Sequence, residues 1–241
     1  MTELLTNLKV NSDELPKKVL VCGDPARAEK IASLLDDSKL LAKNREYHSY
    51  KGSWQGVELA IVSHGVGSPG AAVCFEELAK GGAKTIIRIG TAGSYQAEIQ
   101  PGHIVISTAA VRRDGLTSQL VPEGFPAVAN RQVVEQLADA ANARNQQIHE
   151  GITLTLDVFY SGIIEFPHEL YKKAGVLAVE MENSALFTIG AIRGVNTGAI
   201  LAIDGYADAD LRNDYNPHTD LVSEAIEQEA FIALDAIIHS K

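Results

Sequence analysis

Three features that would assign the chain to well-known protein classes are scarce or absent. The first is cysteine, of which there are two among 241 residues. Cys22 and Cys74 each lie in an apolar segment, without CxxC or Cys/His spacing. We interpret both as small core residues, so the sequence predicts no disulfide, no zinc site and no other metal site.

The second missing feature is an excess of positive charge. The formal net charge is −10 at pH 7, which argues against general binding to nucleic acid or to a membrane surface. Any bound anion would have to be held by a few local arginines against the overall field.

The third is a long apolar run. No run approaches the roughly 20 residues needed to cross a bilayer. The segment "MTELLTNLKVNSDELPKK" also lacks the basic stretch followed by an apolar one that is typical of a secretory signal. We therefore expect a soluble, cytoplasmic protein. The 46% hydrophobic content and the absence of a linker or repeat suit a single domain over residues 1–241.

Short apolar runs that suit strands alternate with longer amphipathic stretches that suit helices. Strands, with the turns that follow them, are expected at 17–25, 57–70, 84–94, 102–111, 176–182 and 197–205, and helices at 25–37, 70–83, 130–146, 183–194 and 220–240. The predicted fold class is α/β, a single domain with a central mixed, mostly parallel sheet flanked by helices on both faces. In such sheets ligands bind beyond the carboxyl ends of the strands.

The glycines in "GVGSPG", Gly65, Gly67 and Gly70, match the GxGxxG pattern of dinucleotide sites. The next strand ends without the Asp or Glu that would hold a ribose, and Pro69 suits an ordinary first helical position. We therefore favour a tight turn that allows close backbone approach over a dinucleotide site.

Arginines follow or interrupt two of the predicted strands. Arg88 lies within the apolar run "TIIRIGTAGS", and Arg27 lies in the first turn of a helix after Gly23. A buried guanidinium needs either a carboxylate or a bound anion, and a cation at a helix N-terminus opposes the helix dipole. With Thr91 and the nearby glycine amides, the two arginines could form a phosphate cradle. An exposed Arg27 paired with Asp24 or Glu29 is the alternative.

Three carboxylates and one aromatic residue are further candidates for a binding site. Glu180 and Glu182 in "LAVEMEN" are two residues apart, so on a strand they would share a face. They could accept hydrogen bonds from sugar hydroxyls or pair with an arginine. Asp204 ends an apolar strand and could donate a proton or cap a turn. Phe159 could supply a flat wall for a ring or pack in the core.

These motifs together resemble the nucleoside phosphorylase I family. The segments GDPxR, NREY, SHGVGSPG with FEELAKGGAK, RIGTAGS, FPAVA, VEME and IDG occur in family order and cover nearly the whole chain. The resemblance is greatest to hexameric purine nucleoside phosphorylases of the apicomplexan type, with uridine phosphorylases next. It implies reversible phosphorolysis of a purine ribonucleoside of the inosine or guanosine type, giving free base and ribose 1-phosphate. Phosphate would be a co-substrate, no cofactor would be needed, and the protein would be a homo-oligomer, a hexamer built as a trimer of dimers.

The resemblance also implies roles for individual residues. Phosphate would be held by Gly23, Arg27, Arg88 and Thr91, with Arg45 reaching in from a neighbouring subunit. Ribose and base would be bound by Ala92, Gly93, Phe159, Glu180, Met181 and Glu182, with Asn7 from the neighbour. The catalytic groups would be Glu182, near the developing positive charge of the sugar, and Asp204, which would protonate purine N7.

Two positions depart from the family pattern. Asn7 stands where a histidine is usual, although an amide can still donate a hydrogen bond. The segment after Tyr160 lacks the Gln and Arg pair with which uridine phosphorylases bind uracil, and Ile163 and Glu165 fall near those positions, which favours purines. Uridine phosphorolysis remains the alternative, and a nucleoside hydrolase, a non-catalytic nucleoside-binding protein and an NAD oxidoreductase are more distant ones. The segment 204–218 is either a mobile lid or a solvated loop.

Overall fold

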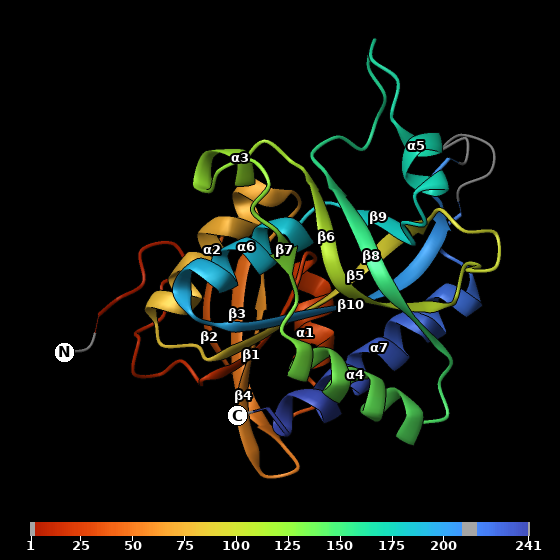
Figure 1. Ribbon diagram of the computed structural model, residues 1–241. Helices are drawn as coiled ribbons and strands as arrows, with labels where there is room; N and C mark the ends of the chain where they lie inside the picture. The colour runs from red at the N-terminus through yellow and green to blue at the C-terminus, as the bar shows by residue number, and fades with distance from the viewer. Residues whose placement is uncertain (1–2, 209–215, 241) are drawn as a thin grey trace.

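The computed structural model describes residues 3–208 and 216–240 of the chain (Figure 1). Of the expected 204–218 loop, residues 209–215 therefore lie outside the described part. The strands are β1 Lys18–Cys22, β2 Asp36–Asn44, β3 Tyr47–Trp54, β4 Val57–Ser63, β5 Thr85–Ser94, β6 Ile104–Arg113, β7 Ala127–Val128, β8 Ile148–Leu156, β9 Ala178–Glu180 and β10 Asn196–Tyr206. The helices are α1 Pro25–Ala32, α2 Ser68–Lys80, α3 Thr117–Leu120, α4 Arg131–Ala143, α5 His168–Lys173, α6 Asn183–Arg193 and α7 Asp220–Ile238.

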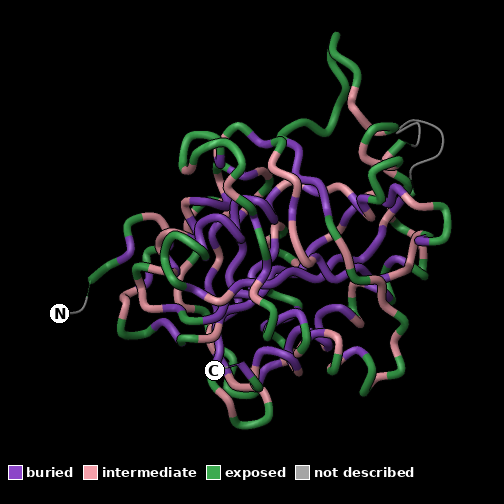
Figure 2. The backbone as a smooth tube through the Cα atoms, in the orientation of Figure 1, coloured by how far each residue is buried: buried purple, intermediate pink, exposed green. Residues whose placement is uncertain are grey.

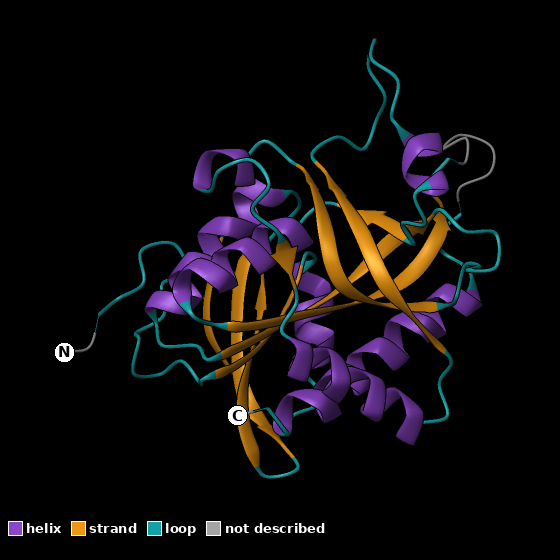
Figure 3. Ribbon diagram, viewed as in Figure 1, coloured by secondary structure: helices purple, strands orange, loops and turns teal. Residues whose placement is uncertain are grey.

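The strands form one mixed sheet, which confirms the predicted α/β class (Figure 3). Its centre is parallel, with β1 between β4 and β5 and with β10 on the other side of β5. Antiparallel pairs extend it through β3 and β2 on one side and β6 on the other. Because β8 and β9 connect β6 back to β5, the strands β5, β10, β6, β8 and β9 pair in a closed ring.

Helices cover both faces of the sheet (Figure 1). Helices α2 and α6 pack together on one side, and α1, α4 and α7 lie on the other, where α7 contacts β10, β5 and β1. The central strands are buried on both sides (Figure 2), which explains why they are continuous apolar runs rather than alternating ones. Among the described residues, no helix is long and apolar enough to cross a membrane.

The main differences from the expected elements lie between residues 32 and 54 and at 148–156. The helix expected at 25–37 ends at Ala32, and edge strand β2 begins at Asp36. Most of β2 is exposed, and exposed edge strands carry charged residues rather than an apolar pattern. The sequence "DDSKLLAKN" therefore gave no strand signal, and neither β3 nor β8 was expected.

The four parallel strands place their carboxyl ends along one edge. There β4 leads into His64 and Gly65 and β1 into Gly23, while Thr91 and Asp204 lie within β5 and β10, near their carboxyl ends. This is the edge at which ligands of α/β sheets bind.

Candidate active site

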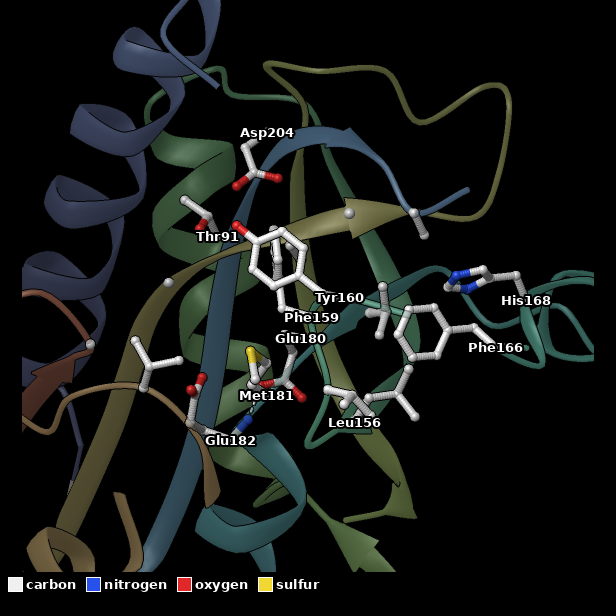
Figure 4. A pocket seen from close by; sticks show the side chains of 18 of the residues that line it. Thr91, Leu156, Phe159, Tyr160, Phe166, His168, Glu180, Met181, Glu182 and Asp204 are labelled. Atoms are coloured by element: carbon white, nitrogen blue, oxygen red, sulfur yellow. Dashed lines mark hydrogen bonds between the residues drawn. The ribbon is translucent and has the colours of Figure 1, made fainter. Parts of the chain in front are cut away.

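A large pocket opens at this edge of the sheet (Figure 4). Its volume is about 1630 Å³, compared with roughly 300–1,000 Å³ for typical small-molecule sites, so a nucleoside and an anion fit together. Eleven of the residues expected from the sequence line it, namely Gly23, Arg27, Arg88, Thr91, Ala92, Gly93, Phe159, Glu180, Met181, Glu182 and Asp204. These residues, which are far apart in the sequence, therefore share one pocket.

The first cation of the pocket lies at the start of α1. Asp24 caps this helix by accepting a hydrogen bond from the Ala26 amide at 2.8 Å, and Pro25 fills its first turn. The nearest carboxylate partner of Arg27 is Glu229 on α7, at 3.9 Å, rather than Asp24 or Glu29. Gly23 lets this turn pack tightly, because a Cβ there would lie 3.0 Å from the carbonyl oxygen of Gly65.

Arg88 projects from the middle of β5 and is 4% exposed. Its Nη2 pairs with Glu182, and its Nη1 lies 3.3 Å from Glu180 and donates to the side-chain oxygen of Asn183 at 3.0 Å. Among the described residues, its Nε has no hydrogen-bond partner. Burial lowers the pKa of Arg88, but Glu182 and Glu180 outweigh this effect and raise it. The buried guanidinium is thus met by carboxylates, one of the two options that the sequence left open.

Gly90 makes room for this guanidinium. A Cβ at Gly90 would lie 2.8 Å from Nη1 of Arg88 and 2.9 Å from its Cζ and Nη2. Such distances are shorter than van der Waals contact, so any side chain at residue 90 would displace Arg88.

Glu180 is held by the start of helix α6. It accepts hydrogen bonds from the amides of Glu182 and Asn183, both at 2.7 Å, and from the Thr155 hydroxyl at 2.5 Å. Orphan amides at a helix N-terminus favour an anion in this way. Burial nevertheless raises the pKa of Glu180, with Arg88 acting in the opposite direction.

Glu182 connects the glycine-rich turn to Arg88. Its Oε1 accepts from the Gly67 amide at 2.6 Å while its other oxygen pairs with Arg88. The Ser68 hydroxyl donates to the Met181 carbonyl at 2.9 Å. Here the GxGxxG-like turn donates the Gly67 amide to the protein's own carboxylate, in agreement with the tight-turn interpretation.

His64 precedes this turn and was missed by the sequence analysis. It is fully buried, its ring packs edge-on against Phe75, and its Nδ1 lies 2.9 Å from the Gly65 carbonyl. Burial lowers the pKa of His64 to about 4. A neutral ring whose Nδ1–H donates to Gly65 therefore fixes the entry to the turn, and its position after a buried strand was the available signal.

Asp204 lies at a β-bulge in β10. The β5–β10 register runs from Ala92 opposite Ile203 to Gly93 opposite Gly205, so Asp204 is the extra residue. Bulges redirect a side chain next to an active site, and Figure 4 shows the carboxylate facing the same hollow as Thr91 and Tyr160.

Aromatic residues also line the pocket. Phe159 and Tyr160 form an edge-to-face pair with ring centroids 5.2 Å apart, and both are substantially exposed. Phe166 and His168 form a second such pair at 5.1 Å; these two were not singled out from the sequence, although "EFPHE" shows an aromatic next to a histidine. Glu165 also lines the pocket, whereas Ile163 points to solvent.

Asn7 and Arg45 are not among the residues that line this pocket. The side-chain amide of Asn7 donates to Glu77 at 2.7 Å, and Asn44 donates to the Asn7 carbonyl at 2.7 Å. Arg45 follows Asn44 in the β2–β3 turn, with φ 54°. The two residues expected to serve a neighbouring subunit thus lie close together on one chain, outside its own pocket.

The described residues contain no group of three or more His, Cys, Asp or Glu that could hold a metal ion.

Comparison with known proteins gives the family that the sequence motifs resemble. Residues 17–239 match the family described as the phosphorylase superfamily. A purine nucleoside phosphorylase of Plasmodium falciparum is 42% identical over 224 residues, or 90% of this chain and 91% of the relative. A uridine phosphorylase of Haemophilus influenzae is 36% identical over 76% of this chain and 78% of the relative.

A solved structure extends the similarity to the whole fold. The purine nucleoside phosphorylase of Toxoplasma gondii in complex with immucillin-H superposes with a TM-score of 0.94 at 35% identity, over 98% of this chain and 95% of that one. With a matching family over most of its length and relatives well above 30% identity, the chain belongs to the phosphorylase superfamily.

Proposed function

We propose that this protein is a purine nucleoside phosphorylase, which catalyses the reversible phosphorolysis of purine ribonucleosides to free base and ribose 1-phosphate. One observation carries the proposal: a single pocket holds two guanidiniums and Thr91, a carboxylate on the Met181–Glu182 segment, and Asp204 at a bulge. These are an anion site, a sugar site and a proton donor in one hollow. The reaction would need no cofactor, because phosphate itself is the nucleophile.

Phosphate is expected to bind between the ends of β1 and β5. Arg27, Arg88 and the Thr91 hydroxyl are its side-chain ligands in this proposal, together with the amide of Gly23. The N-terminus of α1 adds its dipole. Binding there would hold an oxygen of the anion next to the anomeric carbon that it attacks. The two reactants would then react within one complex and would not have to meet in solution.

Glu182 is the proposed sugar ligand. Two of its lone-pair positions are used by Gly67 and Arg88, and a carboxylate has about four such positions. The remainder can accept hydrogen bonds from the 2′ and 3′ hydroxyls of ribose. The same negative charge would stabilise the positive charge that develops on the sugar ring as the bond to the base breaks.

Asp204 is the proposed general acid. A purine anion is a poor leaving group, and a proton delivered to N7 turns it into a neutral base. Phe159 and Tyr160 offer flat faces against which the base can stack. Ala92 and Gly93, opposite the bulge, line the pocket beside it.

The partner subunit is also part of the proposal. The described pocket has only Arg27 and Arg88 as arginine or lysine side chains, against the carboxylates Asp24, Glu165, Glu169, Glu180, Glu182, Asp204 and Asp208. A dianion therefore needs further positive charge. Arg45 of a neighbour, accompanied by Asn7, would supply it in a homo-oligomer, for which a hexamer is proposed.

Subunit mixing tests this shared site. Arg45→Ala and Asp204→Asn variants are each expected to be nearly inactive, yet co-refolded mixtures should regain activity. In a randomly paired dimer about a quarter of the sites would carry both native residues. Separately refolded samples, mixed only in the assay, are the control. If the mixture regains no activity, each site is built from one chain.

The choice of base is tested by initial rates with inosine, guanosine, adenosine and uridine, each with and without phosphate. We expect phosphate-dependent release of hypoxanthine or guanine well above that of uracil. Uridine phosphorolysis is the second candidate function, supported by the 36% identity to the uridine phosphorylase of Haemophilus influenzae. A higher rate with uridine than with the purine nucleosides would favour it. Release without phosphate would instead indicate a hydrolase.

A further inference from the structure

Behind the anion site lies a carboxylate that the proposed reaction does not use. Glu229 projects from α7 toward the sheet and is 0% exposed. Neither of its oxygens makes a well-formed hydrogen bond in the part of the chain that the structure describes, although the backbone amide of Ala202 on β10 lies close enough to favour the ionised form. Its ion pair is with Arg27, at 3.9 Å from Nη1 to Oε1. A buried carboxylate with so few partners is unfavourable when ionised.

Charged and titratable groups on the neighbouring elements act on the Glu229 carboxyl. Arg27 on α1 and Arg88 on β5 favour its ionised form, whereas Asp204 on β10 opposes it. Cys22 on β1 is also close, but burial raises the pKa of this thiol to about 12, so it is neutral. Burial dominates the balance at Glu229 and raises the pKa of the carboxyl to about 8.

Counting charges shows why this group matters for an anion. The two guanidiniums, Arg27 and Arg88, are paired with Glu229, Glu180 and Glu182. With every carboxylate ionised, the cluster carries a net charge of about −1 and should repel a dianion. Protonation of Glu229 removes one negative charge and releases Arg27, which lines the pocket, to meet an oxyanion.

We propose that Glu229 is a positioning residue that exchanges Arg27 for a proton when an oxyanion binds. In the free site at alkaline pH, where Glu229 is ionised, its carboxylate holds Arg27 back toward α7. On binding, Arg27 turns to the anion, and the carboxylate takes up one proton from the solvent. Binding of phosphate is thus linked to proton uptake at a residue that does not touch it. This inference rests on the proposed function, since it concerns how the same anion site binds phosphate.

The linkage has a definite sign. Below about pH 8 Glu229 is already protonated, so an anion binds without further uptake. Above that pH the free site must gain a proton to bind, and the affinity should fall by up to about tenfold per pH unit. A neutral amide at residue 229 should abolish this loss.

Sulfate is the probe that isolates the effect, because it is a tetrahedral dianion without a titratable proton between pH 6 and pH 9. Calorimetric titration in two buffers of different ionisation enthalpy gives the protons taken up per sulfate bound. For the wild-type protein we expect almost none at pH 6.5 and more than half a proton at pH 8.5. Glu229→Gln, which mimics the protonated carboxyl, should show no difference between the two pH values.

Glu227→Gln is the matched control, since Glu227 is an exposed residue on the same helix and should behave as wild type. Should Glu229→Gln fold poorly, the wild-type sulfate affinity from pH 6.5 to pH 9.5 gives an independent measurement. Equal proton uptake by Glu229→Gln and wild type, or an affinity that stays flat above pH 8, would overturn the inference while phosphate-dependent turnover stands. A protein that binds neither sulfate nor phosphate loses the proposed function itself.

Discussion

The amide of Gly67 donates to Glu182 at a distance of 2.6 Å. This bond joins the turn after β4 to the first residue before α6, 115 positions further along the chain. The other oxygen of Glu182 pairs with Arg88, so three segments converge on one carboxylate. A side chain that two partners from different elements hold in place has little conformational freedom. A site that positions a sugar or an anion accurately needs side chains fixed in this way.

Removing the cation from this network should cost both stability and activity. Arg88→Leu leaves Glu180 and Glu182 buried without a counter-ion, so we expect the free energy of unfolding to fall by about 3–5 kcal/mol. Phosphorolysis should be lost as well. Urea unfolding and initial rates are the measurements.

A double variant separates these two effects. Adding Glu180→Gln to Arg88→Leu removes one uncompensated charge and should recover part of the stability but none of the activity. If the double variant regained phosphate-dependent turnover, Arg88 would not be a phosphate ligand.

Sequence patterns predicted the central sheet because its parallel strands are apolar runs bounded by glycine and proline. These patterns did not predict β2, whose exposed residues carry no apolar run. They also extended the helix expected at 25–37 beyond Ala32, where α1 ends. The pocket residues were found because polar groups directly after apolar strands are costly unless used. His64 directly follows the apolar strand β4 and carried the same signal, but it was overlooked beside the glycine-rich turn. Glu229 was missed because a polar residue inside a buried helix is recognised only once its neighbours in space are known.

Gly90 is expected to be essential for the placement of Arg88. In Gly90→Ala the new Cβ would lie 2.8 Å from Nη1 of Arg88, so the guanidinium must move away from Glu182. We expect the KM for phosphate to rise at least tenfold, with a loss of about 1–3 kcal/mol in unfolding free energy. Kinetics at varied phosphate concentration measure the first effect, and thermal unfolding measures the second.

Gly162→Ala is the matched control for this substitution, because a Cβ at Gly162 meets no atom within 4 Å. It should leave the KM for phosphate unchanged. Equal KM values for the two variants would show that Gly90 does not constrain Arg88.

Acid should destabilise the protein through His64. Burial holds its pKa at about 4 in the folded state, against an ordinary value of 6.5. Between pH 6.5 and pH 4 His64 is therefore protonated in the unfolded chain but neutral in the folded one. The free energy of unfolding falls as the pH falls through this range. The full effect is about 3 kcal/mol, since one pH unit corresponds to about 1.4 kcal/mol.

His64→Gln cannot be protonated and should lose less unfolding free energy over this range, even if it is less stable at pH 7. His239, which caps the end of α7, provides the control as His239→Gln. Parallel pH profiles for His64→Gln and the wild type would contradict a buried neutral His64.

Asp204 should matter only for bases that need a proton to leave. Asp204→Asn keeps the size of the side chain at the bulge but cannot donate a proton, so we expect kcat for inosine to fall by about 10²–10⁴-fold. 7-Methylguanosine already carries a positive charge on its base and leaves as a neutral one, so its phosphorolysis should be nearly unaffected. Rates for both nucleosides, compared with those of Asp208→Asn, a second carboxylate that lines the pocket, test this difference. An equal loss for the two nucleosides would show that Asp204 supports binding or folding and is not the acid.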